Sequence, residues 1–187
     1  MQSRELVICS LVQRQVLASR SAGEADRPAL SSALDSSGHL SVFDFASIQA
    51  LTPSYFSSGL LPLWRDQEVA LAAKNLGSIR EDLETCLDLA GVALWDFDHH
   101  EPRGLGALDS SATETLKLCA EKGSVTAAEL STLFPSVKRT AWNNRLASLF
   151  EKRLLRREQH GKSLVYSVPW LQLKGGTYGR RFSQKEA

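Results

Sequence analysis

The first half of the chain alternates between short apolar runs and longer segments with apolar residues every three or four positions. Runs typical of strands lie at 5–12, 39–45, 68–73 and 92–97, and helical spacing lies between them at 24–36, 53–65 and 78–90. Pro28 fits a first helical turn, and Thr52 or Ser54 is placed to cap the next helix. Strands that alternate with helices of this length predict a layered α/β domain over residues 1–98, with a mixed, partly parallel sheet.

The pattern changes after residue 98. Residues 99–108 contain Pro102, Gly104 and Gly106 without periodicity and are predicted to be a linker. Helices are then expected from Asp109 or Ser110 to about Glu121, from a Thr126–Glu129 capping box to Pro135, and over 136–153. Two strand-like runs follow at 154–158 and 163–168, with a turn at Gly161.

This order of helix, helix, short turn, helix and hairpin resembles the winged helix-turn-helix domains of bacterial transcription regulators. The resemblance covers residues 109–170, and its most specific part is TAAELSTLFPSVKRTAWNNRLASLFEKRLLRREQHGKSLVYSVP. It implies duplex DNA as a partner, with the third helix in the major groove. Such regulators commonly act as dimers on paired half-sites, which makes a homodimer a further expectation. The same fold also serves as a protein-docking module.

The third helix of this domain divides into an apolar and a polar side. Trp142, Leu146, Leu149 and Phe150 recur at core spacing, and we expect Trp142 to lie in the core rather than to stack on a base. The opposite side carries amide, hydroxyl and basic side chains, which bond base edges and phosphates. The hairpin adds further basic residues. The expected DNA-contacting residues are Lys138, Arg139, Thr140, Asn143, Asn144, Arg145, Ser148, Arg157, His160 and Lys162.

Charge is distributed unevenly along the chain. The 187 residues have a formal net charge of +1, but residues 1–107 carry −6 and residues 108–187 carry +7. Residues 138–181 hold 11 Lys and Arg against two Glu. A basic stripe on the expected helix and wing is typical of nucleic-acid binding, although a merely solvated basic surface is the alternative. The basic tail at 171–187 is either an arm for a partner or a disordered terminus.

The segment VFDFASIQALTPSYFSSGLLPLW contains a strand ending in Asp44-Phe45, a loop and a helix that begins near Ser54. This resembles the STAS-like domains related to anti-sigma-factor antagonists, over about residues 15–97. The resemblance implies docking of a protein partner, with kinase-like ATPase domains among the family's partners, and it places Ser54 where some members carry a phosphorylated switch serine. The chain departs from that motif at Thr52, where the family has aspartate, and at Pro53.

The remaining features exclude other classes of protein. No apolar run approaches the length of a membrane span, and no motif for catalysis or phosphate binding is present. The three cysteines are widely spaced, as expected for core thiols in a reducing compartment, and the adjacent residues 98–101 are a poor metal set. We therefore expect a non-catalytic, cytoplasmic DNA-binding regulator or recruitment subunit, without metal or cofactor. The alternative is a protein-interaction subunit of a larger complex, in which any nucleic-acid contact is non-specific.

Overall fold

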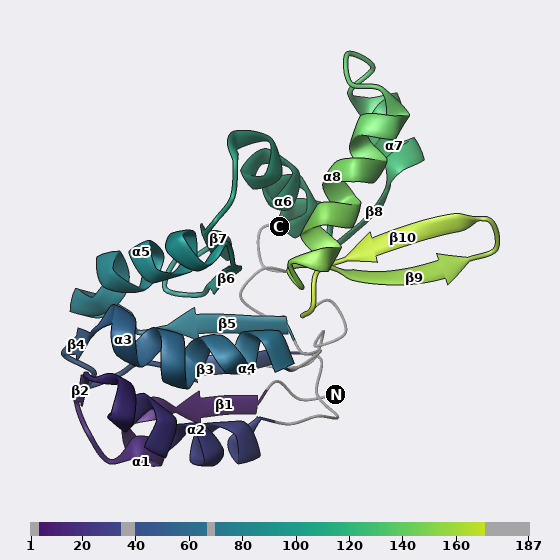
Figure 1. Ribbon diagram of the computed structural model, residues 1–187. Coiled ribbons are helices and arrows are strands. Elements are labelled where there is room, and N and C mark those ends of the chain that lie inside the picture. The colour runs from purple at the N-terminus through teal and green to yellow at the C-terminus, as the bar shows by residue number, and fades with distance from the viewer. Residues whose placement is uncertain (1–3, 35–39, 67–69, 171–187) are drawn as a thin grey trace, which may run out of the picture. The chain divides into compact units, whose positions relative to one another are not determined.

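The computed structural model describes residues 4–34, 40–66 and 70–170 (Figure 1). The chain has a mixed α/β fold, with a mixed sheet and helices. It divides into two compact units, Met1–Ala107 and Leu108–Ala187, which we call unit 1 and unit 2. The tail at 171–187 lies outside the described residues.

Unit 1 is built on a five-stranded sheet in the order β1-β3-β5-β6-β7. Its strands are β1 (Arg4–Val7), β3 (Leu40–Asp44), β5 (Ala70–Lys74), β6 (Ala93–Asp96) and β7 (Arg103–Gly106). The first four pair in parallel, and β7 runs antiparallel to β6. A second, two-stranded parallel pair joins β2 (Val16–Leu17) to β4 (Ala50–Leu51). The parallel strands thus follow one another in space as they do along the chain.

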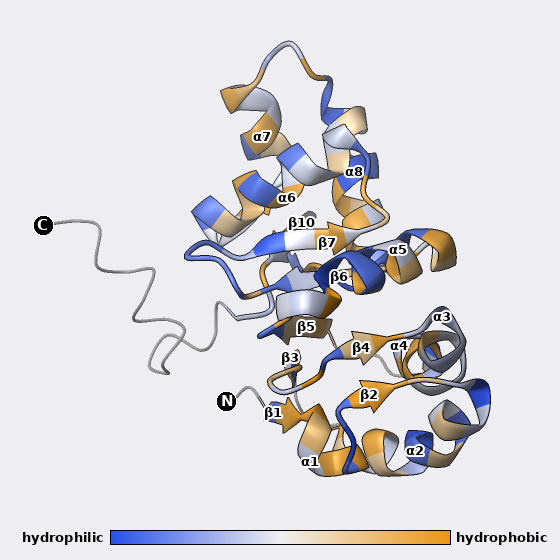
Figure 2. Cartoon of the chain, turned by 90° about the vertical axis from the view of Figure 1, so that its left-hand side faces the viewer, coloured by the Kyte–Doolittle hydropathy of each residue, from blue (hydrophilic) through white to orange (hydrophobic). Residues whose placement is uncertain are grey.

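The helices of unit 1 pack on the sheet through one hydrophobic cluster. They are α1 (Ile8–Val12), α2 (Arg20–Ala33), α3 (Pro53–Tyr55), the π-helical turn η1 (Phe56–Leu60), α4 (Leu61–Asp66), the 3-10 turn η2 (Gly77–Ile79) and α5 (Arg80–Ala90). Leu6, Phe43, Leu71 and Leu94 carry the sheet's side of this cluster. The hydropathy colouring shows apolar strands beside helices with polar and apolar faces (Figure 2). The predicted alternation of strands and helices is therefore present.

Three local expectations for unit 1 were wrong or incomplete. The run 5–12 is not one strand, because β1 ends at Val7 and α1 follows; a short apolar run is compatible with either structure. Pro28 lies inside α2 rather than in its first turn, since the helix begins at Arg20 after the Ser19 cap. Strand β7 lies within the segment expected to be a linker, where Gly104 and Gly106 removed the side-chain alternation that identifies a strand.

Helices α2 and η1 approach each other closely at two glycines. A Cβ on Gly23 would lie 2.2 Å from Ser58 Oγ and 2.9 Å from the backbone nitrogen of Gly59. Beside this contact, the buried Tyr55 hydroxyl donates to Asp26 Oδ2 at 2.8 Å. Together these contacts fix the helical run that begins at Pro53. The hydroxyl of its N-cap, Thr52, accepts from the Tyr55 amide at 3.4 Å, which confirms one of the two expected caps.

In its described residues, 108–170, unit 2 contains three helices and a three-stranded antiparallel sheet in the order β8-β10-β9. In chain order its elements are α6 (Ser110–Lys122), β8 (Ser124–Thr126), α7 (Ala127–Leu133), α8 (Arg139–Glu151), β9 (Arg156–His160) and β10 (Ser163–Ser167). The capping box of Thr126 and Glu129 is confirmed, as is the Asp109 cap of α6. Gly161 has a positive φ of 61° in the predicted hairpin turn. Strand β8 was not expected.

Candidate nucleic-acid interface

The polar side of α8 is exposed, and its apolar side forms the core of unit 2. Trp142, Leu146 and Leu149 are buried, and the prediction that Trp142 is a core residue is confirmed by its 2% exposure. The exposed members of the predicted set on this helix and its cap are Lys138, Arg139, Thr140, Asn143, Asn144 and Ser148. Amide and hydroxyl groups therefore lie along one solvent-facing side of a 13-residue helix.

The N-terminus of α8 is positively charged, and neither a capping side chain nor an acidic residue of the helix offsets this charge. Its N-cap residue, Lys138, makes no side-chain cap, and no acidic residue lies in the first turn. By contrast, α6 and α7 are capped by Asp109 and Thr126. The helix dipole and the exposed Lys138 and Arg139 side chains therefore add at this end of α8.

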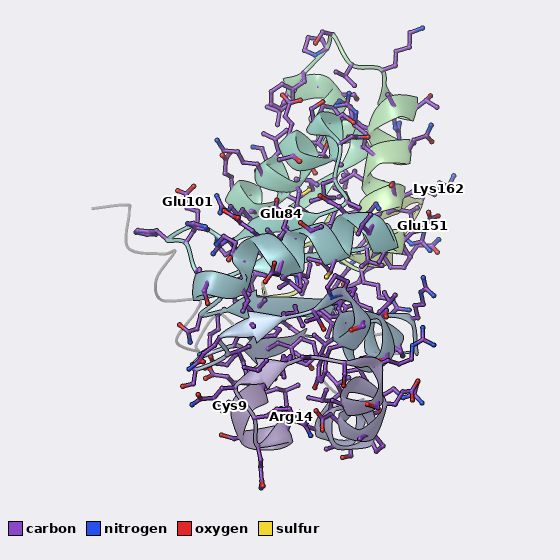
Figure 3. The ribbon with its side chains drawn as sticks, turned by 60° about the vertical axis from the view of Figure 1, so that its left-hand side comes forward. Cys9, Arg14, Glu84, Glu101, Glu151 and Lys162 are labelled. Carbon is purple, nitrogen blue, oxygen red and sulfur yellow. The ribbon has the colours of Figure 1, made fainter. Side chains whose placement is uncertain are left out.

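The hairpin β9–β10 carries Arg157, His160 and Lys162 of the predicted set, and the structure places these three on different parts of it. In the hairpin, Arg157 pairs with Tyr166 and His160 pairs with Ser163. Arg157 and His160 are three residues apart in one strand, so their side chains lie on different faces of the hairpin. His160 Nε2 lies 3.4 Å from Glu158 Oε2. Lys162 follows Gly161 in the turn and extends outward from the tip of the hairpin (Figure 3).

Two arginines of the predicted set are stacked on aromatic rings. The Arg145 guanidinium carbon lies 5.0 Å from the centroid of the Trp142 ring, and that of Arg157 lies 4.2 Å from the Phe150 ring. Arg145 is half-buried, and its charge also helps to lower the pKa of Asp109, after the hydrogen bonds from the Ala112 amide and the Ser111 hydroxyl. The half-buried Arg145 is held over the Trp142 ring, and the exposed Arg157 is the better placed of the two to contact a ligand.

Three apolar residues of this unit were not anticipated as part of a functional surface. Leu133 and Phe134, at the end of α7, are 54% and 36% exposed, and Leu164 of the hairpin is 41% exposed. The Phe134 ring also lies 5.8 Å from that of Trp142. The apolar residues of α7 follow helical spacing, which predicts burial, so the sequence gave no signal for this exposure.

Ser54 in unit 1 is exposed, and it does not cap its helix. The cap is Thr52, whose hydroxyl oxygen lies 3.1 Å from Ser54 Oγ. Of the two residues expected to cap this helix, Ser54 is therefore not the cap. Its hydroxyl lies in the first helical turn.

A network of charges joins the carboxyl ends of β3, β5 and β6. Asp96 is fully buried and accepts from Arg80 at 2.5 Å and from Arg103 at 3.1 Å. Burial alone would raise the pKa of Asp96, but hydrogen bonds from Arg80, the Asp98 amide and Arg103 outweigh it and lower this pKa below its usual value. These contacts tie β6, β7 and the start of α5 together.

Asp44 and Asp98 are held in the same region by neutral and charged donors. Asp44 accepts from the Ala46 amide and from Asn75 Nδ2, both at 2.8 Å, and Lys74 Nζ lies 3.3 Å from its other oxygen. Asp98 accepts from the backbone amides of Asn75 and Leu76. The carboxylates of Asp44 and Asp98 thus hold the segments that follow β3 and β5 against the ends of the strands.

Comparisons with known proteins provide no relative: no family model, no curated protein and no solved structure matches the chain. No helix in the described ranges is long and apolar enough to cross a membrane. Within the same residues, no group of three or more His, Cys, Asp and Glu side chains could hold a metal ion. The three cysteines are free thiols, and burial raises the pKa of Cys119 to about 12.

Proposed function

We propose that this chain is a non-catalytic DNA-binding protein that acts in the cytoplasm as a transcriptional regulator or as a recruitment subunit. Unit 2 would be a winged helix-turn-helix that binds duplex DNA, and unit 1 a STAS-like domain that docks a protein partner. The observation that carries the proposal is the exposed polar side of α8, with its uncapped basic N-terminus.

The order of elements in unit 2 supports this interpretation. A capped helix α6 is followed by the α7–α8 pair and a hairpin, and β8 closes a small sheet with the hairpin. Asn143 and Asn144 offer amides that can pair with adenine, while Lys138 and Arg139 can contact phosphates. The basic residues Arg157 and Lys162 on the hairpin add positive charge beyond the helix itself.

The direct test is the salt dependence of duplex binding by the full chain. If several phosphates are contacted, affinity should fall steeply, roughly tenfold or more for a few-fold increase in salt. Fluorescence anisotropy with a labelled duplex at several salt concentrations would measure this slope. No binding at low salt would exclude the proposal.

Two lysines of unit 2 provide a charge-matched comparison. Lys138→Ala removes a cation at the proposed interface, and Lys117→Ala removes one from α6, where the Lys117 side chain is 71% exposed. We expect Lys138→Ala to weaken duplex binding and to reduce the salt slope by about 1, while Lys117→Ala changes neither. Equal effects of the two variants would show that net charge alone drives binding.

Asn144→Ala tests whether α8 reads bases. If the Asn144 amide bonds a base edge, its loss should reduce sequence preference by about 1–3 kcal/mol. Anisotropy competition between a selected site and scrambled duplexes would measure this preference. An unchanged preference would restrict α8 to backbone contacts.

For unit 1, support for a STAS-like docking domain comes from the elements around Ser54. Strand β3 ends at Asp44, and the capped helical run after Thr52 leads into β5. Exposed acids on α5, including Glu81, Asp82 and Glu84, would suit a basic partner. Affinity capture with the wild-type chain and an Asp82→Asn/Glu84→Gln variant would test this, and equal recovery of every partner would contradict it.

The exposed apolar residues of unit 2 favour the second candidate function, a protein-interaction subunit. Leu133, Phe134 and Leu164 would then form protein contacts rather than flank DNA. The duplex experiment separates the two functions. Only the protein-interaction function is compatible with no measurable duplex binding at low salt.

A further inference from the structure

We infer that Phe150 is a positioning residue, which holds the Arg157 guanidinium in place for a phosphate of the bound duplex. This inference rests on the proposed function and adds a specific role for the contact between α8 and the hairpin. Phe150 itself would not touch DNA.

The contact joins two elements that approach the ligand separately. Phe150 lies in the last turn of α8, and Arg157 lies in β9 (Figure 1). The Arg157 guanidinium carbon lies 4.2 Å from the ring centroid, well within the range of a cation–π interaction. Phe150 is half-buried and Arg157 is exposed, so the ring is partly enclosed by unit 2 while the cation remains open to solvent.

The position of Phe150 on the helix relates Arg157 to the proposed reading residues. Asn143, Ala147 and Phe150 follow the spacing i, i+4 and i+7, which places them along one side of α8. Asn143 is exposed at one end of this line, and the stacked Arg157 lies at the other. About 10 Å of helix separates the two ends, at 1.5 Å per residue.

Stacking suits an arginine that binds phosphate. The donors of a guanidinium lie at the edges of its plane, so a ring on one face leaves them available for a bidentate contact. Ordering a long side chain on binding costs affinity, and a side chain that is already ordered avoids this cost. Hence removal of the ring should weaken binding although the charge remains.

Four variants of the full chain test the inference, with duplex affinity and its salt slope as readouts. Phe150→Leu should weaken binding about two- to tenfold with an unchanged slope, because the cation is still present. Arg157→Lys keeps the charge but lacks the planar group, and should behave in the same way. Arg157→Ala should reduce the slope by about 1, and Phe150→Tyr, which retains a ring, should bind like the wild type.

The double variant Phe150→Leu/Arg157→Ala separates positioning from a general effect on structure. If Phe150 acts through Arg157, adding Phe150→Leu to Arg157→Ala should have no further effect. Additive losses, or wild-type affinity for Phe150→Leu or Arg157→Lys, would overturn the inference while the proposed function stands. Absence of duplex binding by the wild-type chain would overturn both. Arg157→Lys and Phe150→Tyr keep the test decisive if Phe150→Leu fails to fold.

Discussion

Asp96 illustrates at the scale of one residue how this fold accommodates a buried charge. Its carboxylate is fully buried at the end of β6, and it is paired with Arg80 and Arg103. Placing a charge there is costly, and the two guanidinium groups offset the cost by charge and by hydrogen bonds. The sequence showed an acid after an apolar run but no partner, because Arg80 lies 16 residues away and belongs to another element.

Removing this charge should destabilise unit 1. Asp96→Asn leaves Arg80 and Arg103 without their shared carboxylate, and we expect the free energy of unfolding to fall by about 2–4 kcal/mol. Urea denaturation followed by circular dichroism would measure the change. Asp88→Asn, at an exposed position of α5, is the matched control and should lie within about 0.5 kcal/mol of the wild type. An equally mild effect of Asp96→Asn would contradict a stabilising role for the network.

The same network predicts how stability depends on pH. The pKa values of Asp44 and Asp96 are lowered in the folded chain: burial opposes this in both, but is outweighed for Asp44 by Asn75, the Ala46 amide and Lys74. These carboxylates therefore stabilise the fold above their unfolded pKa of about 3.9 and lose this effect as pH falls through their folded values. The urea concentration at the midpoint of unfolding should therefore decrease as the pH falls below about 4. This decrease should be less steep in Asp96→Asn than in the wild type.

At the scale of elements, the contact between α2 and η1 depends on small residues. Gly23→Ala would place a methyl group 2.9 Å from both the Gly59 nitrogen and the Tyr55 carbonyl oxygen, and backbone atoms cannot easily move aside. We expect a loss of about 1–3 kcal/mol in the free energy of unfolding. Glu24→Ala, next to it on the exposed side of α2, is the control. Wild-type stability of Gly23→Ala would show that the two helices can separate without cost.

Local signals predicted some elements well and others not at all. The α7 capping box was readable because Thr126 and Glu129 satisfy each other's backbone groups over three residues. Strand β7 could not be predicted, because its pairing with β6 is non-local and its glycines carry no pattern. In the candidate interface, spacing identified the exposed side of α8, but the stacking of Arg157 on Phe150 depends on how the hairpin folds back.

At the scale of the whole chain, the two units should unfold in separate steps. Asp96→Asn and Gly23→Ala should shift only the transition of unit 1. Thr126→Ala, which removes a helix cap, should shift only that of unit 2, by about 1 kcal/mol. Hydrogen exchange monitored by mass spectrometry would assign each transition. A single transition that all three variants shift together would show that the units form one cooperative system.

The opposite net charges of the two halves indicated two parts of the chain before any element was predicted. The division at residues 107 and 108 coincides with the change from −6 to +7. Composition could locate this change, since charge is additive along a chain. It could not show that Arg145 is half-buried over Trp142 while Arg157 is exposed over Phe150, because both contacts depend on how the chain folds.

The strand order of unit 1 has a consequence for its synthesis. Within the five-stranded sheet, each of β3, β5 and β6 pairs with the strand of that sheet made before it. The sheet can therefore grow from one edge as the polypeptide leaves the ribosome, and the antiparallel β7 completes it. Because residues 8–39, 45–69 and 75–92 separate the parallel partners, the growing edge of the sheet stays unpaired until each crossover has been made.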